Sequence, residues 1–440
     1  MTPTRWQVFS SAPHRMFFWG AMAVSLLSMA LWSLHLAEES LPPEWGLPAW
    51  AGLEWTLPPR PAHGVLMVFG MLGAAFLGFL LTTFPRWLVS EPVARRHYIA
   101  IWFFHTGGGL VWVAGMVARP AAAQPWLGML GAAGMGIGYA LALVRLGRVK
   151  ALATNQDPQT HHHAQFVMTA FGMGLVGLGL AVAGCLAWGL GGLGFDTYPL
   201  GLAAFQFSLA LGVYPFAFLM VLTVAHRMVP FFTSTVVAGY DIRRGGALLW
   251  MGAPILALRA AVMWLGHPQI TWITDLPLLV LLLRELVLWR FWQVPPIPLL
   301  RVLYWALAWM GISLVLSITE SLMVITQAGF IPAAAPFGNA ALHALTVGGF
   351  GTMMLGMFTR VTLGHSGLGI TSAGWMESML FRGFQLVVLW RVGTEVLAGL
   401  GYSTAGLLWI SGLGWLAVFG VWFARFGRVL TRPRVDGQPG

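Results

Sequence analysis

Charged side chains are scarce in this sequence. They make up 9% of the 440 residues, against roughly 25% in a soluble globular domain, and Lys150 is the only lysine. Apolar residues make up 58% of the chain. A soluble fold could not cover its surface with so few charges, so most of this surface must face lipid. The formal net charge of +10 does not indicate nucleic-acid binding, because the arginines lie between apolar runs, as in membrane proteins.

Cysteine is nearly absent as well. Cys185 is the only one, and it lies within an apolar run. An intrachain disulfide is therefore excluded, as is any CxxC motif for zinc, redox chemistry or c-type haem attachment. The motifs GxSxG and HExxH and the Walker loop are also missing, which removes the common signatures of soluble hydrolases, zinc proteases and nucleotide-binding enzymes.

Long apolar runs take the place of these features. A membrane-spanning helix needs about 20 mostly apolar residues, and twelve segments qualify. They are approximately 16–36, 63–85, 98–118, 125–146, 164–190, 200–225, 246–265, 272–289, 302–326, 339–358, 378–398 and 403–424. We therefore predict an all-α polytopic membrane protein with about twelve transmembrane helices, forming a single integral-membrane domain over residues 1–440.

The basic residues predict how this domain is oriented. With twelve spans, Arg60 and Arg119 fall on the outer side and Arg259 and Arg391 lie within spans, which leaves 20 of the 24 basic residues (24 − 4) on the inner side. An excess of arginine and lysine marks the cytoplasmic side, so both termini are expected in the cytoplasm. Residues 37–62 then form an outer loop rich in Trp and Pro, and residues 425–440 a basic cytoplasmic tail.

Spans two, six and ten end alike. Each has a leucine followed five residues later by an arginine, in the segments Leu81–Arg86, Leu222–Arg227 and Leu355–Arg360. The arginines are 141 and 133 residues apart, which is four helices each time. Three four-helix units are therefore one interpretation. The alternative is that an arginine commonly follows an apolar helix on the inner side.

Several charges lie inside predicted spans, where they are costly and usually pair or line a site. Arg391 and Glu395 are four residues apart on span eleven and face the same side of it. Arg259 on span seven and Glu320 on span nine have no partner nearby in the sequence. These charges form either interhelical ion pairs or a functional path for protons.

Ten of the twelve histidines fall at two depths, while His14 is near the N-terminus and His267 is in a short outer loop. Imidazole binds haem iron, copper and zinc, and two imidazoles from different helices can hold a haem in a helix bundle. His63 opens span two and His343 opens span ten, so they are our predicted haem pair, with the Met67 thioether one turn below His63. At each position a packed or solvated histidine is the alternative. The outer histidines are His35, His63 and His343, and the inner ones are His97, His105, His161, His162, His163, His226 and His365.

The stretch Ala341–Gly367 resembles the C-terminal signature of the NnrS family. Arg227–Thr233, Gly78–Pro85, and Arg15 with the following Phe17-Phe18 resemble further parts of that family, in the same order along the chain. NnrS proteins are bacterial inner-membrane proteins with twelve predicted helices, described as containing haem and copper and linked to nitric oxide tolerance. The resemblance implies this location, a haem and a connection to nitric oxide.

This chain departs from the family pattern on span two. The family typically has His-Ala-His-Glu-Met there, whereas His63–Met67 reads His-Gly-Val-Leu-Met. The second histidine and the glutamate are missing, so a copper site built from two imidazoles on this helix cannot form. Haem is thus the expected cofactor and copper a doubtful one. His226 stands where the family has glycine, and it suggests a second inner metal or cofactor site with His365 or His105.

A more distant resemblance is to the haem–copper oxidases, which are also described as twelve-helix proteins with pseudo-threefold order. Their low-spin haem is held by histidines on helices two and ten, the helices of His63 and His343. The histidines that bind copper in the oxidases, on helices six and seven, have no counterpart at mid-membrane depth here. Oxygen reduction at a binuclear centre is therefore not expected.

The sequence favours a haem-binding inner-membrane protein that handles nitric oxide or moves electrons from membrane quinol. His63 and His343 would be axial ligands, and Arg227 and Arg360 would be propionate or structural partners at the inner edge. If both axial positions are filled, a gas cannot bind without displacing a ligand. Two filled axial positions favour electron transfer by a haem-dependent oxidoreductase, with quinol or a respiratory-chain protein as partner. Gas binding would instead need a second haem. A small-solute transporter, or an assembly partner of a respiratory complex without a cofactor, is the alternative.

Overall fold

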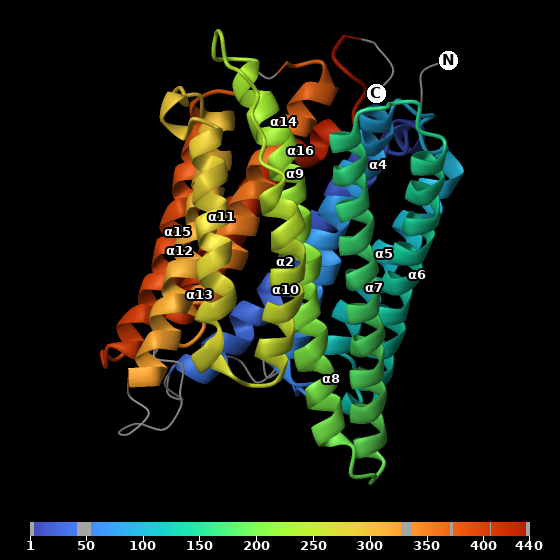
Figure 1. Ribbon diagram of the computed structural model, residues 1–440. Helices are drawn as coiled ribbons and strands as arrows, with labels where there is room; N and C mark the ends of the chain where they lie inside the picture. Colours follow the sequence, from blue (N-terminus) through green and yellow to red (C-terminus); the bar gives the residue numbers. More distant parts are fainter. Residues whose placement is uncertain (1–3, 42–53, 327–336, 370–372, 405, 437–440) are drawn as a thin grey trace.

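The computed structural model describes residues 4–41, 54–326, 337–369, 373–404 and 406–436 as a bundle of long helices running side by side (Figure 1). The all-α prediction is confirmed, since no strand occurs among the described residues. The α-helices are α1 (Arg5–Phe9), α2 (Pro13–Ser40), α3 (Pro59–Val65), α4 (Gly73–Leu88), α5 (Arg95–Met116), α6 (Gln124–Ala151), α7 (Pro158–Gly192), α8 (Tyr198–Leu211), α9 (Leu219–Ser234), α10 (Ala247–Trp264), α11 (Trp272–Leu288), α12 (Pro298–Thr326), α13 (Ala340–His343), α14 (Thr352–Ser366), α15 (Trp375–Gly399) and α16 (Leu408–Leu430).

Ten helical spans among the described residues are long and apolar enough to cross a membrane. The two further predicted spans correspond to α11, which has 17 residues, and α15, which carries four charged side chains in 25 residues. The polytopic membrane class is therefore confirmed, and ten of the twelve spans meet the criteria of length and composition.

Contacts at both ends of α11 show that it runs antiparallel to α10 through the bundle. Near its start, Asp275 accepts a hydrogen bond from Arg259, close to the end of α10, at 2.8 Å. Near its end, Glu285 accepts one from the backbone N–H of Gly245, just before α10, at 2.9 Å. The α15 helix pairs with α16 in the same way, through Glu377 with Arg425 at one end and Trp390 with the Leu407 carbonyl at the other. Both helices thus traverse the bundle although their composition is less apolar.

The first span begins, and the last span ends, on the same face of the bundle. Arg15, at the start of α2, donates hydrogen bonds to the carbonyls of Leu430 and Arg432 at the end of α16, at 3.1 and 2.8 Å. The chain therefore crosses the bundle an even number of times. The placement of this face in the cytoplasm remains a prediction from the arginine distribution.

Three π-helical segments interrupt the central spans: η2 (Leu66–Leu72), η4 (Gly212–Phe218) and η7 (Ala344–Gly351). They lie in spans two, six and ten, the three spans that the leucine–arginine pattern relates, and η4 contacts both η2 and η7. Turns of this kind are rare in proteins as a whole, and those that occur are often at functional sites. Local sequence preference does not explain these turns. They therefore mark the centre of the bundle as a candidate functional region.

The arginines that end these three spans each reach the end of another span of the set. The contacts are Arg227 over the Trp87 ring at 4.9 Å, Arg360 over the Phe232 ring at 3.7 Å, and Arg86 with His365 through electrostatic interaction. Span six thus reaches span two, span ten reaches span six, and span two reaches span ten. This cyclic pattern supports the interpretation of three related four-helix units.

Helices α5 and α6 approach through glycine. A Cβ atom added at Gly131 would lie 2.8 Å from the carbonyl oxygen of Gly108, and one added at Gly108 would lie 2.6 Å from that of Gly131. Both obstacles are backbone atoms, which cannot rotate away. Small residues at such crossings let helices pack closely in membranes.

A Gly131→Ala variant is therefore expected to push α5 and α6 apart and to destabilise the protein by about 1–3 kcal/mol, the usual cost of overpacking. The matched control is Gly107→Ala, where an added Cβ meets nothing within 4 Å and alanine favours the helix. Thermal unfolding of the detergent-purified variants, followed by circular dichroism, tests this. Equal melting temperatures for the two variants would contradict it.

Candidate functional site

The outer ends of spans two and ten carry the predicted haem histidines. His63 lies on α3, which begins at Pro59, a residue whose fixed φ suits the first turn of a helix. Its imidazole stacks on the Trp32 ring of α2, with ring centroids 4.6 Å apart and an interplanar angle of 10°. The Nδ1 atom of His63 is buried without a hydrogen-bond partner. Buried polar atoms are nearly always bonded, so this nitrogen is available to a ligand.

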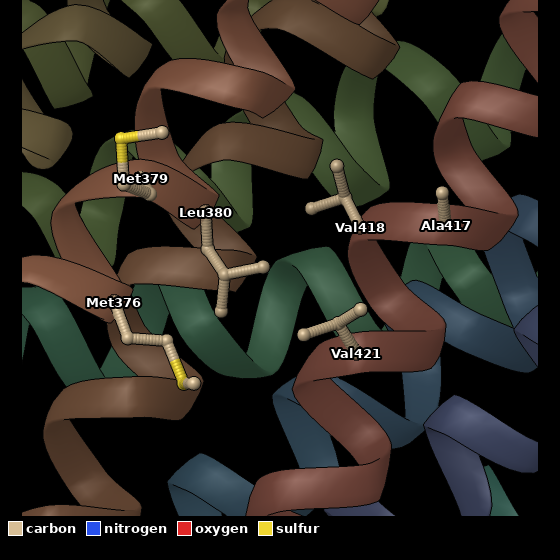
Figure 2. A pocket seen from close by; sticks show the side chains of 6 residues that line it. All are labelled: Met376, Met379, Leu380, Ala417, Val418 and Val421. Atoms are coloured by element: carbon tan, nitrogen blue, oxygen red, sulfur yellow. The ribbon is translucent and has the colours of Figure 1, made fainter.

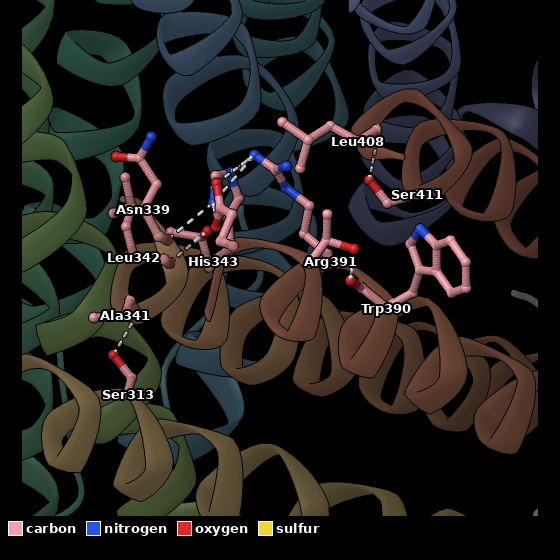
Figure 3. A network of polar contacts seen from close by, with 12 residues as sticks. Ser313, Asn339, Ala341, Leu342, His343, Trp390, Arg391, Leu408 and Ser411 are labelled. Carbon is pink, nitrogen blue, oxygen red and sulfur yellow. Dashed lines mark hydrogen bonds and ion pairs between the residues drawn. The ribbon is translucent and has the colours of Figure 1, made fainter. Parts of the chain in front are cut away.

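His343, by contrast, has both ring nitrogens engaged (Figure 3). Nδ1 lies 3.0 Å from the Asn339 carbonyl oxygen and 3.1 Å from a Glu395 carboxylate oxygen. Because these oxygens can only accept, Nδ1 carries the proton. Nη2 of Arg391 lies 3.4 Å from Nδ1 and 3.2 Å from Nε2, so the guanidinium packs against the ring near both nitrogens. The imidazole is thus held between an acid and a base of the same helix, α15.

Arg391 and Glu395 pair with each other as the sequence predicted, at 3.0 Å. Both are nearly buried, at 8% exposure. His63 interacts electrostatically with both His343 and Arg391. The stacked pair Trp32 and His63 and the bonded group His343, Arg391 and Glu395 lie at corresponding ends of spans two and ten, and together they are here named the outer histidine cluster.

These contacts show which histidine of the cluster could bind haem iron. His63 fits an axial ligand, because it has a buried unbonded nitrogen and a ring fixed by stacking. His343 fits less well, because the Arg391 guanidinium lies within 3.4 Å of both its ring nitrogens and would place a positive charge next to the metal. The residues thus fit a haem held on one side by His63, rather than one held between two histidines.

A rim of aromatic residues adjoins the cluster. His35 lies 5.2 Å from both the Trp32 and Trp55 rings, measured between centroids, and 3.4 Å from the Glu39 carboxylate. Trp55 belongs to the predicted outer loop and thus packs against the last turns of α2. The other two tryptophans of that loop, Trp45 and Trp50, lie outside the described residues.

Two further predicted site residues lie deeper. Met67 is half-buried in the first turn of η2, packed against the core. His105 is buried, and its Nε2 bonds the Phe69 carbonyl of η2 at 2.9 Å, where the Tyr139 hydroxyl also donates at 3.0 Å. A π-helical turn displaces carbonyls from their usual N–H partners. His105 and Tyr139 therefore satisfy a backbone group, and His105 is not near His226.

The inner histidines separate into two pairs that the sequence did not predict. His226 lies against His163 of α7, with Nδ1 and Nε2 of the two rings 2.9 Å apart, and its other nitrogen bonds the Gly245 carbonyl at 2.9 Å. His365 lies against His14 of α2. The predicted second site combining His226 with His365 or His105 is thus not assembled.

Arg227 and Arg360 cannot serve a haem at the outer cluster. Arg360 follows His343 by 17 residues in one continuous span, a rise of about 25 Å, which is most of the ~30 Å hydrocarbon thickness. Of the two predicted roles, only the structural one is supported: Arg360 stacks on Phe232, and Arg227 donates to Thr160 at 2.9 Å.

A surface cavity of about 280 Å³ lies elsewhere, between α15 and α16 (Figure 2). It is lined by the apolar residues Met376, Met379, Leu380, Ala417, Val418 and Val421. Without a polar lining group it cannot orient a reactive substrate, so it adds nothing to the site.

Sequence reasoning missed Trp32 of the outer cluster and Asn339, whose carbonyl oxygen bonds His343. The tryptophan is 31 positions before His63 and carries no local signal for stacking. The link between His343 and Glu395 had a partial signal, because Arg391 and Glu395 were predicted on one face of span eleven, but no partner on span ten was predicted for them.

Comparison with known protein families gives one match that covers nearly the whole chain. The NnrS family, described as NnrS protein, matches residues 8–434. No curated protein matches the chain. The family is generally associated with haem and copper, and membership supports a role in the response to nitric oxide. The expectation drawn from Ala341–Gly367 is confirmed over nearly the full length, and the chain belongs to the NnrS family.

Proposed function

We propose that this protein binds haem at the outer histidine cluster through His63 alone, and that the bound haem would handle nitric oxide there. The observation that carries the proposal is the contrast between the two histidines. His63 keeps a buried nitrogen without a partner, whereas His343 is held by Arg391 and Glu395. A single axial imidazole leaves one coordination position open to a gas.

The chain's own residues have distinct tasks in this proposal. His63 holds the iron, with its ring fixed against Trp32. Haem would supply an iron centre that binds nitric oxide and changes oxidation state. Arg391 would place N–H donors beside the group that His63 holds, where they can bond an oxygen of the ligand. His343, whose own N–H is bonded to Asn339 and Glu395, would position Arg391. Glu395 neutralises the Arg391 charge, which would otherwise be costly at this depth.

The location is part of the same proposal. The arginine distribution and the shared face of the first and last spans support a bacterial inner-membrane protein with cytoplasmic termini. The cluster would then lie near the outer surface. Membrane quinol is the electron donor that this placement makes accessible, and the protein would act as an oxidoreductase.

Visible spectroscopy of the detergent-purified protein, with iron and copper analysis of the same sample, tests the proposal. We expect a haem of five-coordinate, high-spin character in the reduced state, which converts to a nitrosyl spectrum on titration with nitric oxide. A six-coordinate low-spin spectrum that disappears in His343→Ala would instead restore the two-histidine arrangement. A featureless spectrum without metal would end the haem proposal and favour a transporter or an assembly partner.

A further inference from the structure

Five basic side chains gather at the opposite, inner end of the bundle. They come from the start of α2, the end of α4, the end of α14 and the segment after α16. They are His14, Arg15, Arg86, His365 and Arg434, here named the inner basic cluster. His14 interacts electrostatically with Arg15, Arg86 and His365, and His365 with Arg15, Arg86 and Arg434. Four segments far apart in the sequence thus bring positive groups to one place.

The two imidazoles form the floor of this cluster. Their ring centroids are 4.6 Å apart, with an interplanar angle of 38°. His14 is 1% exposed, and its Nδ1 is buried without a hydrogen-bond partner. His365 is half-buried and Arg86 is exposed, so the cluster opens toward the inner surface from a buried base.

Among the described residues, the positive charges of the cluster outnumber the acids near them. Arg15 is 3% exposed, spends Nη1 on two backbone carbonyls and leaves Nε buried without a partner. The nearby acid is Asp436, which bonds Arg434 at 2.9 and 2.6 Å. Its carboxyl carbon would lie 2.9 Å from a Cβ atom added at Gly367, two residues from His365. Three guanidinium charges against one carboxylate leave an excess of two.

Helix ends explain part of this arrangement. Arginines stabilise the carbonyl ends of helices, and Arg86 lies in the last turn of α4. That reason does not apply to His14, which lies in the first turn of α2, where the helix end is positive. The guanidinium groups gathered around the two imidazoles repel one another, and an anion between them would relieve this repulsion.

We propose that the inner basic cluster binds a phosphate group. A tetrahedral phosphate has several oxygens that accept hydrogen bonds at once, and guanidinium groups bind such oxygens in pairs. The imidazole N–H groups of His14 and His365 can donate to the remaining oxygens. Basic pockets between helices at the inner membrane edge suit the phosphate of an anionic lipid headgroup, and free phosphate has the same chemistry. The Asp436 carboxylate competes for this place.

Two arms of one experiment distinguish the sources. In the first, detergent-purified full-length protein is titrated with inorganic phosphate at constant ionic strength, and the melting temperature is followed. In the second, protein is reconstituted in phosphatidylcholine vesicles with or without phosphatidylglycerol. The variants are Arg86→Gln and the pair His14→Gln with His365→Gln. The control is Arg148→Gln, which removes an exposed charge of the same face.

We expect stabilisation of the wild type and of Arg148→Gln in at least one arm, with apparent affinity reduced about tenfold or more in the cluster variants, because bonds to charged groups are strong. Asp436→Asn should bind more tightly, since a competitor is removed. A response to phosphate identifies a free anion as ligand, and a response to phosphatidylglycerol alone identifies a lipid. Equal responses of Arg86→Gln and Arg148→Gln in both arms would overturn the proposal.

Discussion

A His63→Ala variant is expected to lose its haem, with an affinity drop of more than about 100-fold. Loss of a partner that only orients a metal ligand already costs 10–100-fold, and here the ligand itself is removed. His63 is the histidine of the outer cluster with a buried, unbonded nitrogen, so no neighbouring ring can replace it without breaking other bonds. The haem-to-protein ratio of the purified variant, from its visible spectrum, measures the effect.

The matched control is His343→Ala. Its imidazole is bonded to Asn339, Arg391 and Glu395, so its removal should leave haem bound. It should change how nitric oxide binds, because Arg391 loses the ring that holds it in place. If His343→Ala loses haem as completely as His63→Ala, iron is held by both histidines and the single-ligand arrangement is wrong.

An Asp275→Asn variant is expected to destabilise the protein by about 3–5 kcal/mol, the cost of leaving one partner of a buried ion pair uncompensated. Asp275 is 1% exposed and Arg259 5%. Their contact of 2.8 Å is reinforced by Ser317, which donates to Asp275 at 2.6 Å and accepts from Arg259 at 2.9 Å. The unfolding free energy in mixed detergent micelles measures the loss.

Two comparisons make this prediction specific. Asp241→Asn removes the acid of an exposed pair with Arg243 and should leave stability unchanged within error, since exposed pairs contribute little. The double variant Arg259→Met with Asp275→Leu should recover most of the stability, because a buried pair replaced by apolar groups is often neutral. A loss in Asp275→Asn no larger than in Asp241→Asn would show that the pair contributes nothing.

Much of the fold was predictable because it depends on composition over windows of about 20 residues. Apolar runs of that length predict helices in lipid whatever surrounds them, since every backbone polar group must be satisfied within the segment. The same local logic placed Arg391 and Glu395 on one face of span eleven and brought His63 and His343 to equal depth. The repeat of leucine and arginine likewise marked spans two, six and ten.

Which of these groups is free to react was decided by tertiary structure. The sequence treats His63 and His343 as equivalent, yet only the neighbours supplied by α2 and α15 leave one ring unbonded and saturate the other. Asp275 was not recognised as the partner of Arg259, and His163 and His14 were not recognised as partners of His226 and His365. Sequence by itself determined which segments form long apolar helices, whereas His105, predicted on the inner side, bonds Phe69 of η2 within span two. The hydrogen bonds of each polar group come from segments distant in the chain, so their saturation, and with it the chemistry left to each histidine, follows only from the packed bundle.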